Sequence, residues 1–341
     1  MTSALKVLDA GPYTTFQDMG RMGYQDVGVP VSGAVDKVSA RLANVLVGNP
    51  PGAAVLEMLL QGMSFEVQAS AARVALFGCD GQLAVTGARR LSVPAGRSVR
   101  LVRGDVVKVT SLGRSLSGYL ALEGGFDLPM QLGSASTYVR GGIGGLQGRV
   151  LQRGDILPLA APDVDVRSEK ELAAPYDYGY SQAIRVVLGP QDDYFTPQAR
   201  HVFFSGEYVV SDKADRMGFR LDGPALEHAD GYDLVSDGIV SGAIQVPGSG
   251  LPIVLLADAQ TTGGYPKIAT VISSDISVLA RRRPGSAVRF EQVSLEEAEA
   301  LARDLHARLC NIAEYGLREV APAGVIDLAA LRTENLTSGV V

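Results

Sequence analysis

The chain has 341 residues, with 31 Lys and Arg against 37 Asp and Glu and a formal net charge of -6. This mixed, mildly acidic composition offers no basic face and argues against a nucleic-acid-binding protein. The length is sufficient for a sizeable core and predicts two domains or subdomains. The 40 glycines predict many tight turns, as in a β-rich protein.

The cysteine content indicates the cellular compartment. Only Cys79 and Cys310 occur, far apart in the sequence, so we expect neither a disulfide framework nor a metal site. Residues 1–7 lack the basic and apolar regions of a signal peptide, and no apolar run has membrane-spanning length. The sequence therefore predicts a cytoplasmic protein that does not enter a membrane.

The first predicted elements are a strand and a helix. A strand near residues 6–8 precedes a polar stretch punctuated by glycine, at 15–23. Asp36 has the residue type of a helix N-cap, and an apolar face follows it. The sequence Gly-Asn-Pro-Pro at 48–51 ends this helix.

Short β-prone runs separated by glycines recur from about residue 54 to 159, which is typical of a barrel or sandwich. These runs are 55–60, 64–67, 73–77, 83–86, 98–102 and 106–110.

The second half of the chain repeats the β-rich pattern. Residues 164–180 are polar and predict a linker, after which strand-like segments continue to residue 290. Ser294 and Glu297 form a capping-box pattern that begins a helix with an apolar stripe. We therefore expect a mainly β fold with few helices, in three parts. These are an N-terminal β-rich subdomain at 1–165, a second β-rich subdomain at 181–293, and a helix with a tail at 294–341.

The stretch 252–267 combines an apolar run with a polar loop. Residues 252–257 predict a strand buried on both faces. The pair Gly263-Gly264 can take positive φ and brings bare backbone close to a neighbour, while Pro266 stiffens the exit. A tight glycine hairpin is the simpler alternative. A turn, however, requires neither two threonines nor a Gln and a Lys, so we interpret the loop as part of a site.

Several standard sites are excluded. The glycine cluster at 141–149 lacks the Lys-Ser/Thr ending of a P-loop and the spacing of a dinucleotide-binding motif. No G-x-S-x-G elbow occurs, and the three histidines lack metal or triad spacing. What remains are three polar clusters. They are Gln17, Asp18 and Arg21 with Ser32, Gly33 and Asp36; Asp215 and Arg216; and the 258–267 loop preceded by Gln245.

For the charged pairs Asp18–Arg21 and Asp215–Arg216, the alternative to a functional role is an ion pair that closes a turn.

These clusters carry a resemblance to a known family. The motifs at 17–23 (Q-D-x-G-R-x-G), 215–218 (D-R-M-G) and 258–267 occur in the order of that family. The chain resembles the C subunit of ATP-dependent 5-oxoprolinase, a family also called allophanate hydrolase subunit 2, KipA-like or biotin-dependent carboxyltransferase-like. The resemblance covers residues 5–293 and implies cyclophilin-like β-barrel architecture.

The resemblance implies membership of a heteromeric ATP-dependent amidohydrolase that opens 5-oxoproline to glutamate. The implied partners are a related, KipI-like B subunit and, in 5-oxoprolinase, a LamB/YcsF-like A subunit, with ATP bound through the complex. Two alternatives stay open. One is a component of a carboxyltransferase acting on urea or a similar amide, with biotin supplied in trans. The other is a non-catalytic KipA-like regulator that binds a kinase-inhibitor partner.

The resemblance also suggests residue roles. Biotin and 5-oxoproline both present a ring C=O beside an N–H, and negative charge develops there during reaction, so aimed donors and a base are required. Gln260 can donate and accept at once, and Arg216 suits two-point contact with an anion. The expected catalytic residues are Asp258, Gln260, Thr261, Thr262, Lys267, Asp215 and Arg216. The expected substrate-binding residues are Gly263, Gly264, Tyr265, Gln17, Asp18, Arg21 and Gln245.

Two positions depart from the family pattern. Ala135 stands where many members have arginine, which removes a cation. Asp237 stands where many have glutamate, which shortens a carboxylate. Both departures are compatible with a different substrate.

Overall fold

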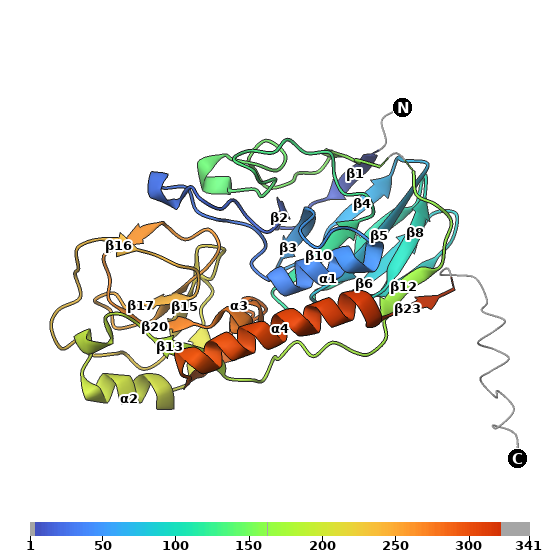
Figure 1. The fold of residues 1–341 in the computed structure, drawn as a ribbon. Helices are drawn as coiled ribbons and strands as arrows, with labels where there is room; N and C mark the ends of the chain where they lie inside the picture. Colours follow the sequence, from blue (N-terminus) through green and yellow to red (C-terminus); the bar gives the residue numbers. More distant parts are fainter. Residues whose placement is uncertain (1–3, 162, 322–341) are drawn as a thin grey trace, which may run out of the picture.

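The computed structural model describes residues 4–161 and 163–321, in which 23 strands accompany four α-helices. Figure 1 shows two β-rich halves with one long helix, α4 (Leu295–Tyr315), lying along both. We call residues 4–161 the N-terminal half and residues 184–292 the C-terminal half. The mainly β fold predicted from the sequence is confirmed.

The N-terminal half consists of two antiparallel sheets packed face to face. The first has the order β11 (Ile156–Pro158), β1 (Ala4–Asp9), β4 (Ser64–Val67), β9 (Val106–Val109), β6 (Gln82–Thr86) and β7 (Leu91–Pro94). The second has the order β2 (Tyr13–Gln17), β3 (Val55–Leu59), β10 (Ser117–Leu122), β5 (Ala71–Phe77) and β8 (Ser98–Val102). Apolar side chains at alternate positions of both sheets, such as Val74 and Leu76 of β5, fill the core between them.

The second sheet is covered on its outer face as well. Helix α1 (Lys37–Val47) begins after the N-cap Asp36 and ends at Gly48, as predicted. Its apolar side chains pack against Ala75 and Phe77, which alternate with the inward-facing residues of β5. Strands β5 and β10 are therefore buried on both faces.

The C-terminal half is built on one eight-stranded sheet. Its order is β21 (Ala287–Val288), β14 (Tyr208–Val210), β15 (Gly218–Asp222), β18 (Ile253–Leu255), β17 (Ala243–Gln245), β20 (Lys267–Val271), β13 (Ile184–Leu188) and β22 (Phe290–Gln292). The two edge strands, β21 and β22, are separated in sequence by Arg289 alone. The sheet must therefore curl until its edges meet, which makes it a nearly closed barrel.

Shorter elements surround this barrel. They are α2 (Pro197–Ser205), α3 (Ser273–Ala280), the two-stranded antiparallel sheet of β16 (Asp237–Gly238) and β19 (Thr262–Gly263), and the short helices η1 (Gln25–Val27), η2 (Val139–Gly141) and η3 (Asp192–Tyr194). None of the helices within the described residues is long and apolar enough to cross a membrane.

The predicted linker contains regular structure. Strand β12 (Glu169–Leu172) pairs with β23 (Leu317–Val320), which follows α4, so the linker is tied to the end of that helix. Helix α4 begins after its cap Ser294, as predicted, and Leu309 of its stripe is buried against the cluster around α1. The predicted tail beyond residue 321 lies outside the described residues. The domain boundaries themselves remain a prediction.

Candidate functional site between the two halves

The polar loop after β18 lies where the two halves meet. Val254 and Leu255 of β18 belong to different apolar clusters, so this strand is buried on both faces, as predicted. The loop then exposes Gln260, whose Nε2 lies 3.5 Å from Oε1 of the buried Gln245. Strand β18 thus places the amide side chain of Gln260 at the surface between the halves.

The two glycines of this loop allow neighbouring groups to approach the backbone closely. Neither Gly263 nor Gly264 has positive φ, so the left-handed conformation considered from the sequence is not used. A Cβ atom on Gly263 would lie 2.7 Å from Nε2 of Gln245, and one on Gly264 would lie 2.8 Å from the carbonyl oxygen of Leu234. Larger residues would push the loop away from its neighbours. Thr262 and Gly263 form β19, while Thr261 is partly buried and Tyr265 is exposed.

Lys267 is buried at the start of β20 and binds β16, one strand of the two-stranded β16–β19 sheet. Its Nζ donates to Oδ2 of Asp237 at 2.5 Å and to the carbonyl oxygen of Gly238 at 3.2 Å. The hydrogen bond from Lys267 lowers the pKa of Asp237. A register shift in β17 pairs Gln245 with Lys267 across the sheet. The shortened carboxylate noted in the sequence is therefore the direct partner of this lysine.

Arg216 is buried and joins the two halves. Its Nε and Nη2 donate to Asp258 at 2.8 and 3.0 Å, Nη2 donates to the carbonyl oxygen of Gly33 at 2.8 Å, and Nη1 donates to Glu57 of β3. Four of its five N–H groups are thus engaged. Burial lowers its pKa, but the fields of Asp258 and Glu57 more than offset this and raise it. This guanidinium is committed to the protein.

Asp215, the neighbour of Arg216, has a different environment. Its side chain is 55% exposed, and its carboxylate accepts hydrogen bonds from the backbone N–H groups of Met217 and Gly218 at 2.8 and 3.2 Å. It closes a turn, and its ion-pair contact is with Arg140, at 3.8 Å. The two adjacent residues therefore do not pair with each other.

Hydrogen bonds around Asp18 hold two loops of the N-terminal half together. The carboxylate of Asp18 accepts from Oγ of Ser134, the N–H of Ala135 and Oγ of Ser136, at 2.5 to 2.7 Å. Arg21 is 1% exposed and donates from Nη2 to the carbonyl oxygen of Ser136. Gln17 is buried and donates to the carbonyl oxygen of Thr137 at 3.0 Å. Ala135, the other position that departs from the family pattern, thus donates to Asp18 through its backbone N–H.

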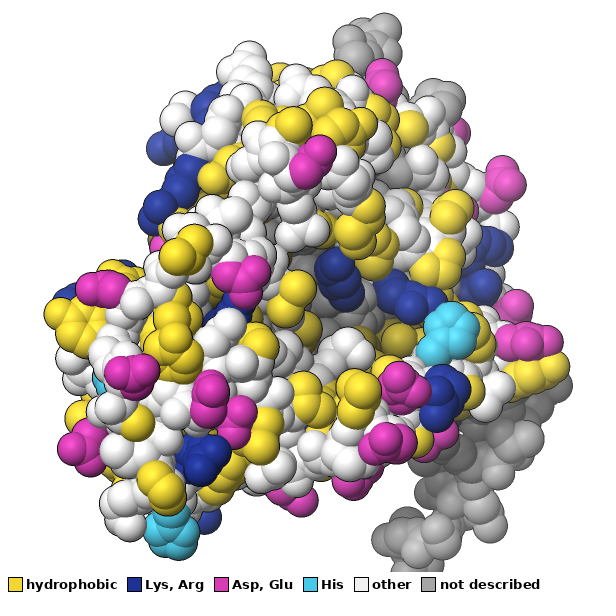
Figure 2. Space-filling view, turned by 60° about the vertical axis from the view of Figure 1, so that its left-hand side comes forward, with side chains coloured by type: hydrophobic (Ala, Val, Ile, Leu, Met, Phe, Trp, Pro, Cys, Tyr) yellow, Lys and Arg dark blue, Asp and Glu magenta, His cyan; other side chains and the backbone are white. Residues whose placement is uncertain are grey.

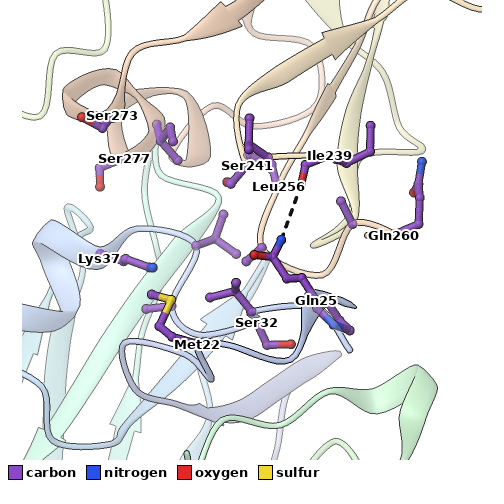
Figure 3. A pocket seen from close by; sticks show the side chains of 18 residues that line it. Met22, Gln25, Ser32, Lys37, Ile239, Ser241, Leu256, Gln260, Ser273 and Ser277 are labelled. Carbon is purple, nitrogen blue, oxygen red and sulfur yellow. Dashed lines mark hydrogen bonds between the residues drawn. The ribbon is translucent and has the colours of Figure 1, made fainter. Parts of the chain in front are cut away.

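A cavity of about 310 Å³ lies between residues 22–37 of the N-terminal half and the loops of the C-terminal half. Gln25 crosses it, with Nε2 donating to the carbonyl oxygen of Ile239 at 3.4 Å (Figure 3). Its walls are mainly apolar, as in many small-molecule sites. Its polar side chains are Gln25, Ser32, Lys37, Ser241, Gln260, Ser273 and Ser277. In the space-filling view the molecule is hollowed at its centre, where hydrophobic and basic side chains meet (Figure 2).

The residues that line the cavity can be compared with the site residues expected from the sequence. Of the fourteen expected site residues, Gln260 lines it. Lys37 and Gln25 were missed, because a cation after a helix cap and an amide in a polar loop look like ordinary surface residues. Glu57 was also missed, although a single acid within the apolar strand β3 is a recognisable sign of a buried ion pair. The roles of the remaining thirteen stay predictions.

Comparisons with known proteins agree on one family. The profile described as carboxyltransferase domain, subdomain A and B, matches residues 27–292. The chain is 38% identical to the C subunit of 5-oxoprolinase from Escherichia coli over 304 residues, which cover 88% of this chain and 94% of that relative. It is 36% identical to the corresponding protein of Haemophilus influenzae over 313 residues, again 88% of this chain and 94% of the relative.

The solved structure of the Kluyveromyces lactis urea carboxylase superposes with a TM-score of 0.83 at 29% identity. The match covers 94% of this chain but 30% of that larger protein. Within the described residues, no group of three or more His, Cys, Asp or Glu side chains is placed to hold a metal ion.

Proposed function

The chain belongs to the carboxyltransferase domain family, subdomain A and B, and on that premise we propose that it is the C subunit of a heteromeric, ATP-dependent 5-oxoprolinase. The complex opens the lactam of 5-oxoproline by breaking the ring C–N bond and adding water, which yields glutamate. The observation that carries this proposal is the 38% identity to the 5-oxoprolinase C subunit over 94% of that relative.

The cavity supports a small cyclic amide as the ligand. Its volume of about 310 Å³ is at the lower end of the range for small-molecule sites. Gln260 can donate to the ring carbonyl and accept from the ring N–H, and no other partner than Gln245 engages its amide within the described residues. An amide aimed at the carbonyl oxygen would stabilise the negative charge that develops there.

Partner proteins are part of the proposal. Met22 and Val240 line the cavity and are 63% and 57% exposed, and the nearby Val27 is 68% exposed. Apolar residues exposed at the rim of a cavity indicate a surface that another protein covers. We assign this surface to the related, KipI-like B subunit, with the LamB/YcsF-like A subunit as the third member of the complex. In isolation the chain is expected to be inactive.

The glycine loop at 141–148 does not fit a nucleotide. The glycines of the 141–148 loop are needed for packing, since a Cβ on Gly144 would lie 2.0 Å from the carbonyl oxygen of Ser136 and one on Gly148 would lie 2.1 Å from that of Gly142. A loop packed this tightly against protein is not a phosphate cradle. We therefore propose that ATP binds elsewhere in the complex.

The test is reconstitution. Co-expression with the A and B subunits should give a complex that hydrolyses ATP only when 5-oxoproline is present. Gln260→Ala should lower the turnover about 100- to 1,000-fold, the range for loss of one aimed donor. Gln152→Ala is the matched control, because Gln152 is exposed on a turn of the N-terminal half. A complex that assembles but never turns over 5-oxoproline would refute the proposal.

The urea carboxylase match favours a second candidate. In that case the chain would act in a carboxyltransferase on urea or a similar amide, with biotin on a carrier supplied in trans. Urea-dependent consumption of carboxybiotin would identify it. A complex with the KipI-like partner that turns over neither substrate would instead indicate a non-catalytic, KipA-like regulator.

A further inference from the structure

The cavity contains a cation that the protein leaves without a partner. Lys37 is the first residue of α1 and lines the cavity. Within the described residues its ammonium neither donates a hydrogen bond nor forms an ion pair. Asp18 acts on it through space, but the carboxylate of Asp18 already accepts from Gly20, Ser134, Ala135 and Ser136. Lys37 therefore feels the field of Asp18 but has no directly paired carboxylate within the described residues.

The surroundings of Lys37 make this costly. The adjoining walls include Pro30, Val35 and Ile276, which offer no hydrogen-bonding side chain. Burial lowers the pKa of Lys37, because removal from water disfavours the charged form. An ammonium that is partly desolvated and unpaired gains strongly from a negatively charged ligand.

Ser32 is a second unsatisfied group in the same cavity. Its Oγ is buried without a hydrogen-bond partner within the described residues. Its backbone is left-handed, with φ at 54°, a conformation that is unusual for serine. Tight packing holds it there, since a Cβ on the adjacent Gly33 would lie 2.7 Å from the backbone N of Gly20. Strain of this kind is retained mainly at functional sites.

The size and charge of the cavity point to a monoanion. A volume of about 310 Å³ admits a single small molecule. Lys37 is the one charged side chain among the described residues that line the cavity, because the nearby carboxylate of Asp36 is paired with Arg281, so a single negative charge on the ligand balances it. Lys37 and Gln260 lie on opposite sides of the cavity, with Gln25 between them (Figure 3). The ammonium of Lys37 is thus the group that a ligand carboxylate in this cavity would contact.

We propose that Lys37 forms a carboxylate subsite, in which its ammonium pairs with the carboxylate of the ligand. Lys37 then determines specificity for cyclic amides that carry a carboxylate over those that do not. The inference rests on the proposed function, because it takes 5-oxoproline as the ligand of this cavity.

The first test measures binding by the assembled complex. Lys37→Met should raise the Kd and KM for 5-oxoproline about 10- to 100-fold, as expected for loss of a charge-assisted hydrogen bond. Lys37→Arg keeps the charge and should retain most of the affinity. Ser32→Ala should leave Kd within about twofold of the wild-type value, because Oγ of Ser32 is enclosed by the protein. Arg41→Met is the matched control, one turn further along α1 and not among the residues lining the cavity.

The ligand 2-pyrrolidinone has the same lactam ring without the carboxylate. Its weak binding should not change in Lys37→Met. If this variant leaves the Kd of 5-oxoproline within twofold of the wild-type value, or weakens both ligands equally, the carboxylate subsite is refuted even where the complex turns over 5-oxoproline.

The second test does not depend on turnover. In the wild-type complex, trace acetylation with acetic anhydride and mass spectrometry should show Lys37 protected by 5-oxoproline and by other small carboxylates, but not by 2-pyrrolidinone. If carboxylates protect Lys37 but the complex does not turn over 5-oxoproline, the subsite is supported and the proposed function is refuted. Labelling that no carboxylate suppresses, or that inorganic phosphate suppresses more strongly, would overturn the carboxylate assignment.

Discussion

Burial gives the two cysteines of the chain different reactivity. Cys79 is 1% exposed, and burial raises its pKa to about 12, whereas Cys310 is exposed on α4. Because the thiolate is the nucleophile, Cys79 should remain an inert thiol at any pH well below 12. At pH 8, iodoacetamide should alkylate Cys310 and reach Cys79 only after unfolding, as followed by peptide mass spectrometry.

Cys310→Ser should therefore abolish alkylation of the native protein. Alkylation of Cys79 at a rate similar to that of Cys310, without unfolding, would show that this region opens readily.

Also at the scale of the residue, the sequence indicated which charged residues are important but not which residues they pair with. Arg216 and Lys267 were expected to be available to a substrate, but they pair with Glu57 and Asp237. Arg216 and Glu57 are 159 residues apart, a separation at which no local pattern indicates pairing. Lys37, by contrast, has no partner within the described residues, and nothing in its neighbouring residues distinguishes it from a surface lysine.

At the scale of the element, Asp36 has two functions that one substitution can separate. It caps α1, accepting from the N–H of Ser39 at 2.9 Å, and it pairs with Nε of Arg281 at 2.6 Å. Asparagine caps helices as well as aspartate does but carries no charge. Asp36→Asn should therefore keep the cap and leave Arg281, which is 1% exposed, unpaired.

Urea unfolding should show a loss of about 3–5 kcal/mol for Asp36→Asn, as for other broken buried ion pairs. In a double-mutant cycle, adding Arg281→Met to this variant should cost much less than in the wild-type protein. A loss below about 0.5 kcal/mol for Asp36→Asn would mean that capping is the main role of this carboxylate.

The elements that the sequence predicted well are those whose signals are local. The cap Asp36, the stop at Gly48 and the cap Ser294 all lie where expected, because capping depends on a few adjacent residues. Strand β10 (Ser117–Leu122) was not predicted, since burial on both faces removes the alternation that marks a strand. Strand β12 was read as linker because its pairing partner, β23, follows 145 residues later.

At the scale of the molecule, two buried ion pairs join the halves. Arg281 and Arg216, from the C-terminal side, pair with Asp36 and Glu57 of the N-terminal half. These pairs position the cavity, because residues 22–37 form one of its walls and the loops before β17 and after β18, with α3, form the other. This geometry requires residues distant in sequence to meet, so it could not be predicted from the local patterns that indicated two β-rich parts.

The strongest test of this coupling is Arg216→Met. Methionine fills much of the volume but leaves the carboxylates of Glu57 and Asp258 buried without their cation, which should destabilise the protein by about 3–5 kcal/mol. Because the pair joins the halves, urea unfolding followed by both circular dichroism and tyrosine fluorescence should separate into two transitions in this variant. The adjacent Asp215→Asn, at an exposed turn, should stay within about 0.5 kcal/mol of the wild-type protein. If Arg216→Met unfolds at the wild-type midpoint but the complex loses turnover, Arg216 acts on the substrate and the coupling of the halves lies elsewhere.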